Sequence, residues 1–119
     1  MFKFLLYKIA SKFIPSIKFS IGLSHITIMR KNYKKIKNIN DLEYKVFSQN
    51  GEDGIIDYLL HSLKIYKPKF IEIGVGDYKE CNSRFIFERT SPKGLIIDNI
   101  KNFKNKVKKN EKLWRGDLT

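Results

Sequence analysis

The sequence has little cysteine and no long apolar run, and each scarcity removes a class of protein. Cys81 is the one cysteine among 119 residues, which excludes an internal disulfide and a zinc site built from several cysteines. The longest uncharged apolar stretch, residues 19–29, has eleven residues and is too short to span a bilayer. His25 and His61 are isolated in the sequence and lack the spacing of metal ligands. We predict a protein of the reducing cytoplasm that binds no metal.

Acidic residues are half as numerous as basic ones, 12 against 24, so the net charge is +12. Residues 1–47 hold ten basic and two acidic residues, and residues 93–119 hold eight and three, whereas residues 48–92 hold six and seven. A near-neutral centre between basic arms suggests a small-ligand site, with the arms facing an anionic partner or water. Nucleic acid is disfavoured as a partner, because the basic segment has only Tyr33 and Tyr44 to stack on bases.

Residues 1–46 are predicted to form a basic amphipathic extension. One face of a helix over residues 1–14 would carry Phe2, Leu5, Leu6, Ile9 and Phe13. Pro15 is expected to end or kink this helix, and the following Arg30–Lys45 segment is typical of a solvated connector. Residues 1–29 are a candidate for peripheral contact with a membrane surface. The alternative is an ordinary helix that packs on its own domain or on a partner.

A polar motif, residues 48–54, precedes a second predicted helix. Ser48, Gln49, Asn50, Gly51, Glu52, Asp53 and Gly54 form this motif. Apolar residues at helical spacing follow and continue to about Lys64. Asn50 is expected to cap the helix, with the two acids near the positive end of its dipole. Capping explains the acids but not the clustering of Gln49 with two glycines.

A buried strand followed by a glycine turn is the centre of the sequence. Residues 69–77 place Glu72 between apolar residues and then bring Gly74 and Gly76 one residue apart. A second short strand ends in Asp98, which lies 22 residues after Gly76. An acid at about this distance after a glycine turn can reach the hydroxyls of a ribose. The pattern therefore predicts half of an adenosine site.

The segments around the second strand complete a βαβ unit. Asn82 or Ser83 is expected to cap a helix over residues 84–88, and residues 91–94 would turn the chain into the second strand. The default for such a unit is a pair of parallel strands with a right-handed crossover. A further helix is predicted over residues 101–110, with an extended segment starting after it. The predicted fold class is α/β.

Four motifs in this order resemble the FkbM-type family of S-adenosylmethionine-dependent methyltransferases. They are Ser48-Gln49-x-Gly51-Glu52-Asp53-Gly54-Ile55, Phe70-Ile71-Glu72-Ile73-Gly74-x-Gly76-Asp77, Asn82-Ser83-Arg84 and Lys93-Gly94-Leu95-Ile96-Ile97-Asp98. The resemblance covers residues 47–119, which would be the N-terminal portion of a Rossmann-like methyltransferase domain of parallel strands with flanking helices.

The resemblance implies S-adenosylmethionine as cofactor and methyl transfer to a hydroxyl of a sugar or another metabolite. Glu72, Gly74 and Gly76 would form the cofactor turn, Asp98 would bind the ribose hydroxyls, and Asp77 would line the same cleft. Asn82, Ser83 and Arg84 would also line it, while residues 48–54 would close over the methionine end of the cofactor. Tyr78 stands where such methyltransferases commonly have a third glycine, and Lys79 stands where the dinucleotide fingerprint has one.

The strands that would complete the sheet are expected after Thr119, so the chain is predicted to be an incomplete methyltransferase. No catalytic base is assigned. The first strand would lack a neighbour on one edge, which predicts pairing with a second chain there. The alternative function is a basic module without catalysis that binds a membrane surface or a partner through residues 1–29.

Overall fold

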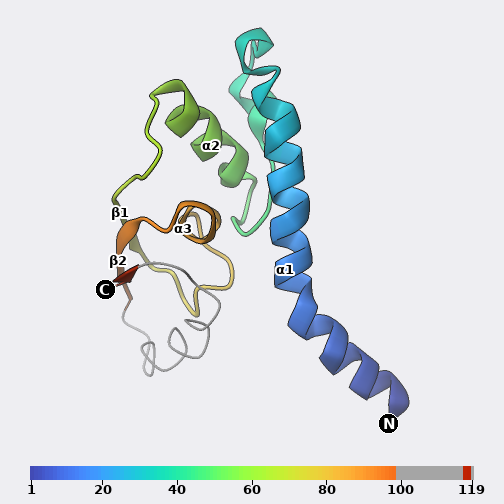
Figure 1. Cartoon of the computed structure of the whole chain (residues 1–119). Coiled ribbons are helices and arrows are strands. Elements are labelled where there is room, and N and C mark those ends of the chain that lie inside the picture. Colours follow the sequence, from blue (N-terminus) through green and yellow to red (C-terminus); the bar gives the residue numbers. More distant parts are fainter. Residues whose placement is uncertain (99–116, 119) are drawn as a thin grey trace.

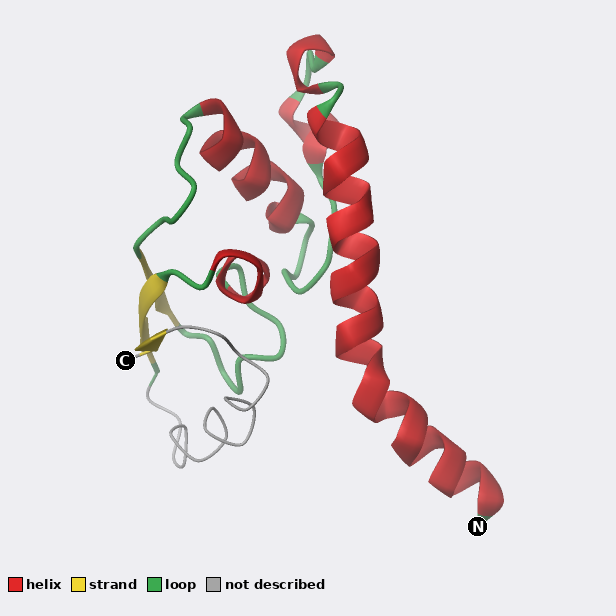
Figure 2. Cartoon of the chain, in the orientation of Figure 1, coloured by secondary structure: helices red, strands yellow, loops and turns green. Residues whose placement is uncertain are grey.

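A computed structural model describes residues 1–98 and 117–118. In chain order its elements are α1 (Phe2–Arg30), the 3-10 helices η1 (Tyr33–Lys35) and η2 (Ile39–Leu42), α2 (Glu52–Ser62), β1 (Phe70–Ile73), α3 (Arg84–Thr90), β2 (Lys93–Ile97) and β3 (Asp117–Leu118). The sheet lies on one side, α1 on the other, and α2 and α3 lie between them (Figure 1, Figure 2). The α/β class is confirmed, while the helix predicted over residues 101–110 lies outside the described residues.

The predicted parallel pairing of the two strands is confirmed. Phe70 of β1 lies opposite Gly94 of β2, and the register continues to Ile73 opposite Ile97. β3 pairs in parallel with the other side of β2, so the order is β1-β2-β3 and β1 is at an edge of the described sheet. Because side chains alternate along a strand, one face of β1 and β2 is turned toward α3 and is largely covered. The other face carries Ile71, Ile73, Leu95 and Ile97, all exposed.

Helix α3 packs on both of its sides. Phe87 belongs to a cluster with Tyr78 and Ile96 beneath the sheet, whereas Phe85 belongs to a cluster with Ile26 of α1. Both phenylalanines are fully buried. Phe85 and Phe87 lie two residues apart, which is about 200° around a helix, so they project from nearly opposite sides of α3. Cys81 also lies buried in the Phe87 cluster.

Helix α1 continues through Pro15, so proline does not end it. Proline removes one backbone hydrogen bond and crowds the preceding turn, and a helix accommodates this by bending. The ribbon bends in its blue first half, and the N-terminal turns swing away from the rest of the chain (Figure 1). The second half packs closely, because a Cβ on Gly22 would lie 2.6 Å from a methyl group of Val46. Residues on both sides of the predicted boundary at residue 46 therefore share one cluster.

The Arg30–Lys45 segment is solvated along most of its length, as its charge predicts, and all of its lysines are exposed. Tyr33 and Leu42 are nonetheless buried, and the ring of Tyr44 stacks on His25 with 3.6 Å between the centroids. These side chains tie the segment to α2 and α1. The predicted solvated connector is therefore confirmed for the basic residues and wrong for Tyr33 and Leu42.

The buried side of α2 is polar. Its buried residues are Asp53, Gly54 and Asp57. Leu59 and Leu63, by contrast, are exposed. The predicted cap is also wrong: Gly51, with φ of +94°, precedes the first helical residue, and the Asn50 N–H is hydrogen-bonded to the Glu52 carboxylate at 2.8 Å.

Candidate functional site

The glycine turn follows β1 directly and is hydrogen-bonded to the end of β2. The Gly74 N–H donates to the carbonyl oxygen of Ile97 over 2.8 Å, which extends the parallel ladder by one residue. The Gly76 N–H donates to Oδ2 of Asp98 over 2.7 Å. The predicted turn and the predicted ribose acid therefore lie together at the carboxyl ends of neighbouring strands. Ligands of open α/β sheets bind at this edge.

Both glycines of the turn adopt backbone conformations that other residues rarely take, with φ of +77° at Gly74 and +60° at Gly76. A Cβ built on either residue would meet no atom within 4 Å. The turn therefore has open space on the side where a side chain would stand. A ligand can approach the backbone there, as a close contact with an adenosine cofactor would require.

Glu72 holds the loop after the turn. Its two carboxylate oxygens accept hydrogen bonds from the N–H groups of Asn82 and Ser83, each over 2.8 Å. These N–H groups precede α3, so a negative charge here is stabilised by the unpaired donors of a helix start. Neither Asn82 nor Ser83 caps α3 with its side chain, although each was predicted to be able to do so. Glu72 instead fixes the two residues that lead into α3, and in this way it supports the loop after the glycine turn.

Tyr78 replaces the expected third glycine by turning its side chain into the core. It has φ of +62° and is fully buried. Its hydroxyl lies 2.7 Å from the hydroxyl oxygen of Ser83, and burial raises the pKa of the phenol above its usual range. Its N–H donates to the Val75 carbonyl over 3.0 Å. The aromatic residue thus anchors the end of the turn.

Asp77 lies at the rim of the turn and is paired with Lys79. Its carboxylate accepts from the Lys79 N–H over 3.1 Å and from the Lys79 ammonium over 3.0 Å. Burial would raise the pKa of Asp77, but the hydrogen bonds and charge of Lys79 hold it below its usual value. The predicted contact of Asp77 with the cofactor stays a prediction.

The polar motif of residues 48–54 makes hydrogen bonds that hold residues 46–48 against the start of α2. Oδ2 of the buried Asp53 accepts hydrogen bonds from three successive N–H groups, those of Val46, Phe47 and Ser48, over 2.7 to 2.8 Å. The Asp53 N–H donates in turn to the Ser48 hydroxyl over 3.1 Å. A Cβ on Gly54 would lie 1.9 Å from the Leu42 carbonyl oxygen. The motif therefore fastens the preceding chain onto the start of α2.

Asp57 is a buried charge centre that the sequence interpretation missed. Arg30 donates to both of its oxygens, over 2.6 and 3.0 Å, and the Tyr33 hydroxyl donates over 2.6 Å. Arg89 of α3 is hydrogen-bonded to the same carboxylate. Burial would raise the pKa of Asp57, but hydrogen bonds from Arg30 and Tyr33 lower it below its usual value. The available signal was an acid four residues after Asp53 on one helical face.

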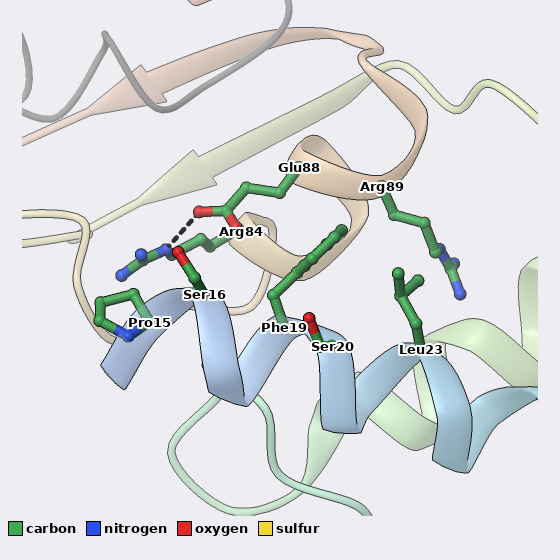
Figure 3. A pocket seen from close by; sticks show the side chains of 8 residues that line it. All are labelled: Pro15, Ser16, Phe19, Ser20, Leu23, Arg84, Glu88 and Arg89. Carbon is green, nitrogen blue, oxygen red and sulfur yellow. Dashed lines mark hydrogen bonds and ion pairs between the residues drawn. The ribbon is translucent and has the colours of Figure 1, made fainter. Parts of the chain in front are cut away.

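A groove of about 450 Å³ lies between α1 and α3 (Figure 3). Pro15, Ser16, Phe19, Ser20, Leu23, Arg84, Glu88 and Arg89 line it. Arg84 and Glu88 form an ion pair at 2.8 Å, and the Arg84 guanidinium lies 3.9 Å from the centre of the Phe47 ring. Arg84 was predicted to line the cofactor cleft. Here it donates to the Lys79 carbonyl, so it braces the loop after the glycine turn.

Comparisons of this chain with models of protein families, with curated proteins and with solved structures found no match. The resemblance to the FkbM-type family therefore stays a prediction. Within residues 1–98 and 117–118, no helix has both the length and the apolarity needed to cross a bilayer. The same residues contain no group of three or more His, Cys, Asp or Glu side chains that could hold a metal ion.

Proposed function

We propose that this chain provides the cofactor half of an S-adenosylmethionine-dependent methyltransferase of the FkbM type. The supporting observation is the pairing of the glycine turn with Asp98 at the carboxyl ends of β1 and β2. The open space beside Gly74 and Gly76 fits an adenosine, and Asp98 is a suitable acceptor for ribose hydroxyls. The order β1-β2-β3 is also that of one half of a Rossmann-like sheet.

Each residue has a defined part in this proposal. The nucleoside would lie in the open space beside Gly74 and Gly76, with its ribose hydroxyls donating to the Asp98 carboxylate. Glu72 keeps the loop before α3 in place. Held by these residues, the cofactor would supply a sulfonium methyl group for transfer to a hydroxyl oxygen of an acceptor. We propose a sugar or another hydroxyl-bearing metabolite as acceptor and the cytoplasm as location.

Calorimetric titration of the chain with S-adenosylmethionine and with S-adenosylhomocysteine tests the proposal. Asp98→Asn should weaken binding at least about tenfold, because a hydrogen bond to a charged group contributes about 1.5 to 3 kcal/mol. Gly76→Ala should weaken it similarly by placing a methyl group in the open space. Asp41→Asn is the matched control, since it removes the same charge at an exposed position of η2, away from the turn.

Saturable binding that survives Asp41→Asn and is weakened at least about tenfold in Asp98→Asn supports the adenosine site. Tighter binding of a nicotinamide dinucleotide than of either sulfonium-derived ligand would instead assign the turn to a different cofactor. Absence of binding by the folded wild-type chain, with its helical circular dichroism intact, would overturn the proposal.

A further inference from the structure

The first half of α1 has an apolar face that no described residue covers. Every residue from 1 to 14 is exposed. We define the α1 apolar face as Phe2, Leu6, Ile9, Phe13 and Ile17, which are between 50% and 75% exposed. Residues 2–17 form about 24 Å of helix at 1.5 Å per residue. Exposed apolar surface of this extent is uncommon on a chain unless it meets a partner.

This face is not the one that α1 turns toward the rest of the chain. The covered or partly covered positions of α1 include Pro15, Phe19, Gly22 and Ile26, which recur at helical spacing. Continued toward the N-terminus with 3.6 residues per turn, that stripe passes Ser11, Lys8 and Phe4. The α1 apolar face therefore lies on a different side of the helix. Packing of α1 on the described body accounts for the stripe and leaves the α1 apolar face unexplained.

The charge around this face has one sign. The first acidic residue of the chain is Asp41, and the 40 residues before it hold nine Lys or Arg. Lys3 and Lys12 flank the α1 apolar face, since they lie about 80 to 100° around the helix from its centre, and Lys34 and Lys35 are exposed beyond the end of α1. Of these basic residues, Arg30 forms an ion pair with Asp57. The remaining cations favour an anionic partner.

We propose that the first half of α1 lies flat on an anionic lipid bilayer, with the α1 apolar face in the acyl boundary and its lysines among the headgroups. Amphipathic helices with lysines and with Phe or Leu on the apolar side bind in this manner. Each lysine near an anionic surface strengthens binding about fivefold, the equivalent of about 1 kcal/mol. The proposal is independent of the cofactor site, because it uses none of its residues.

Flotation with lipid vesicles tests this docking. The full chain is mixed with vesicles of phosphatidylcholine alone or of an equimolar mixture with phosphatidylserine. We expect flotation with the mixed vesicles and at least about tenfold less with the neutral ones. Leu6→Ser combined with Phe13→Ser should abolish it, and Lys3→Glu combined with Lys12→Glu should remove the preference for anionic lipid. Ile71→Ser combined with Ile73→Ser is the control, because it removes two apolar side chains from the sheet that are more exposed than Leu6 and Phe13.

The control variant should float like the wild type. Retained flotation in Leu6→Ser with Phe13→Ser would overturn the proposal, provided that its melting temperature is unchanged, as the exposure of both sites predicts. Equal flotation with neutral vesicles would also overturn it. If the wild type does not float but sediments as a dimer that the same double variant dissociates, the face is a contact between two copies of the chain.

Discussion

Asp57 is a buried carboxylate that receives hydrogen bonds from three separate segments. Arg30 comes from the end of α1, Tyr33 from η1 and Arg89 from α3. These partners lie up to 59 residues apart in the sequence, the separation of Arg30 from Arg89. A charge in this setting is stable only while its partners remain, and loss of one partner leaves the others without compensation.

Asp57→Asn should therefore destabilise the fold by about 3 kcal/mol at neutral pH, the low end for breaking a buried pair. The low end applies because the Arg30 side chain is 40% exposed. Urea unfolding measures the loss. Glu80→Gln is the control, since its pair with Lys45 is exposed on both sides and contributes about 0 to 1 kcal/mol.

The effect of Asp57→Asn on the free energy of unfolding should depend on pH. The pKa of Asp57 is lower in the folded chain than its ordinary value of 3.8. Its contribution is therefore present above about pH 4 and is lost as the pH falls through the lowered folded pKa. The difference in unfolding free energy between the wild type and Asp57→Asn should shrink as the pH drops below 3.8. A difference that stays constant to lower pH would contradict this assignment.

Single residues also mark the limit of what the sequence could predict. The glycine turn and Asp98 were identified because glycine spacing and strand-end acids are local signals. Asp57 was missed because its partners lie far away in sequence and only folding brings them together. Asp53 looked like an acid of a helix start, but the N–H groups that it binds belong to the chain before α2 rather than to α2 itself.

At the scale of elements, α2 depends on a close approach of the preceding chain. Gly54 lies inside the helix, where alanine is usually favoured by about 1 kcal/mol. Here a Cβ would lie 1.9 Å from the Leu42 carbonyl oxygen and 2.9 Å from the Tyr44 nitrogen. Both neighbours are backbone atoms, so the helix or the segment must move.

Gly54→Ala should therefore destabilise the chain, by about 2 kcal/mol or more, reversing the sign that helix propensity predicts. Thermal unfolding followed by circular dichroism measures the change. Ser62→Ala, at an exposed position near the end of the same helix, should stay within about 0.5 kcal/mol of the wild type. An increase in stability on Gly54→Ala would indicate that the backbone at Leu42 and Tyr44 moves away from the new methyl group without lowering the free energy of unfolding.

Elements with a strong local pattern were predicted well. Both strands, the parallel pairing and the helix between them follow from alternating glycine, apolar and turn residues. The continuity of α1 did not follow, because proline weakens a helix without specifying whether the chain stops or bends. Which side of α2 is buried also could not be predicted, since its apolar side chains outnumber the acids that face inward.

At the scale of the whole molecule, the sheet is covered on one face. Parallel sheets are ordinarily enclosed on both faces. The isoleucines of β1 that point away from α3, Ile71 and Ile73, are 69% and 74% exposed. β1 is also an edge of the described sheet. Both features favour association of the chain with other apolar surfaces.

We therefore predict self-association that increases with concentration. Ile71→Thr combined with Ile73→Thr should lower the association constant at least about tenfold while keeping β propensity, because Thr is β-branched. Sedimentation velocity over a concentration series measures this. Leu59→Gln combined with Leu63→Gln, at exposed positions in α2 and at its C-cap, should leave association unchanged. Equal effects of both double variants would show that association is not specific to the sheet.

Helix α3 has a consequence for how freely this sequence can vary. Phe85 and Phe87 belong to different hydrophobic clusters, so the seven-residue helix contributes to the packing of both. A change in the volume of either side chain alters the packing of its own cluster directly. It also alters the packing of the other cluster by displacing the backbone of α3. In a saturation mutagenesis experiment, residues 85–87 should tolerate fewer substitutions than any other run of three in the described chain.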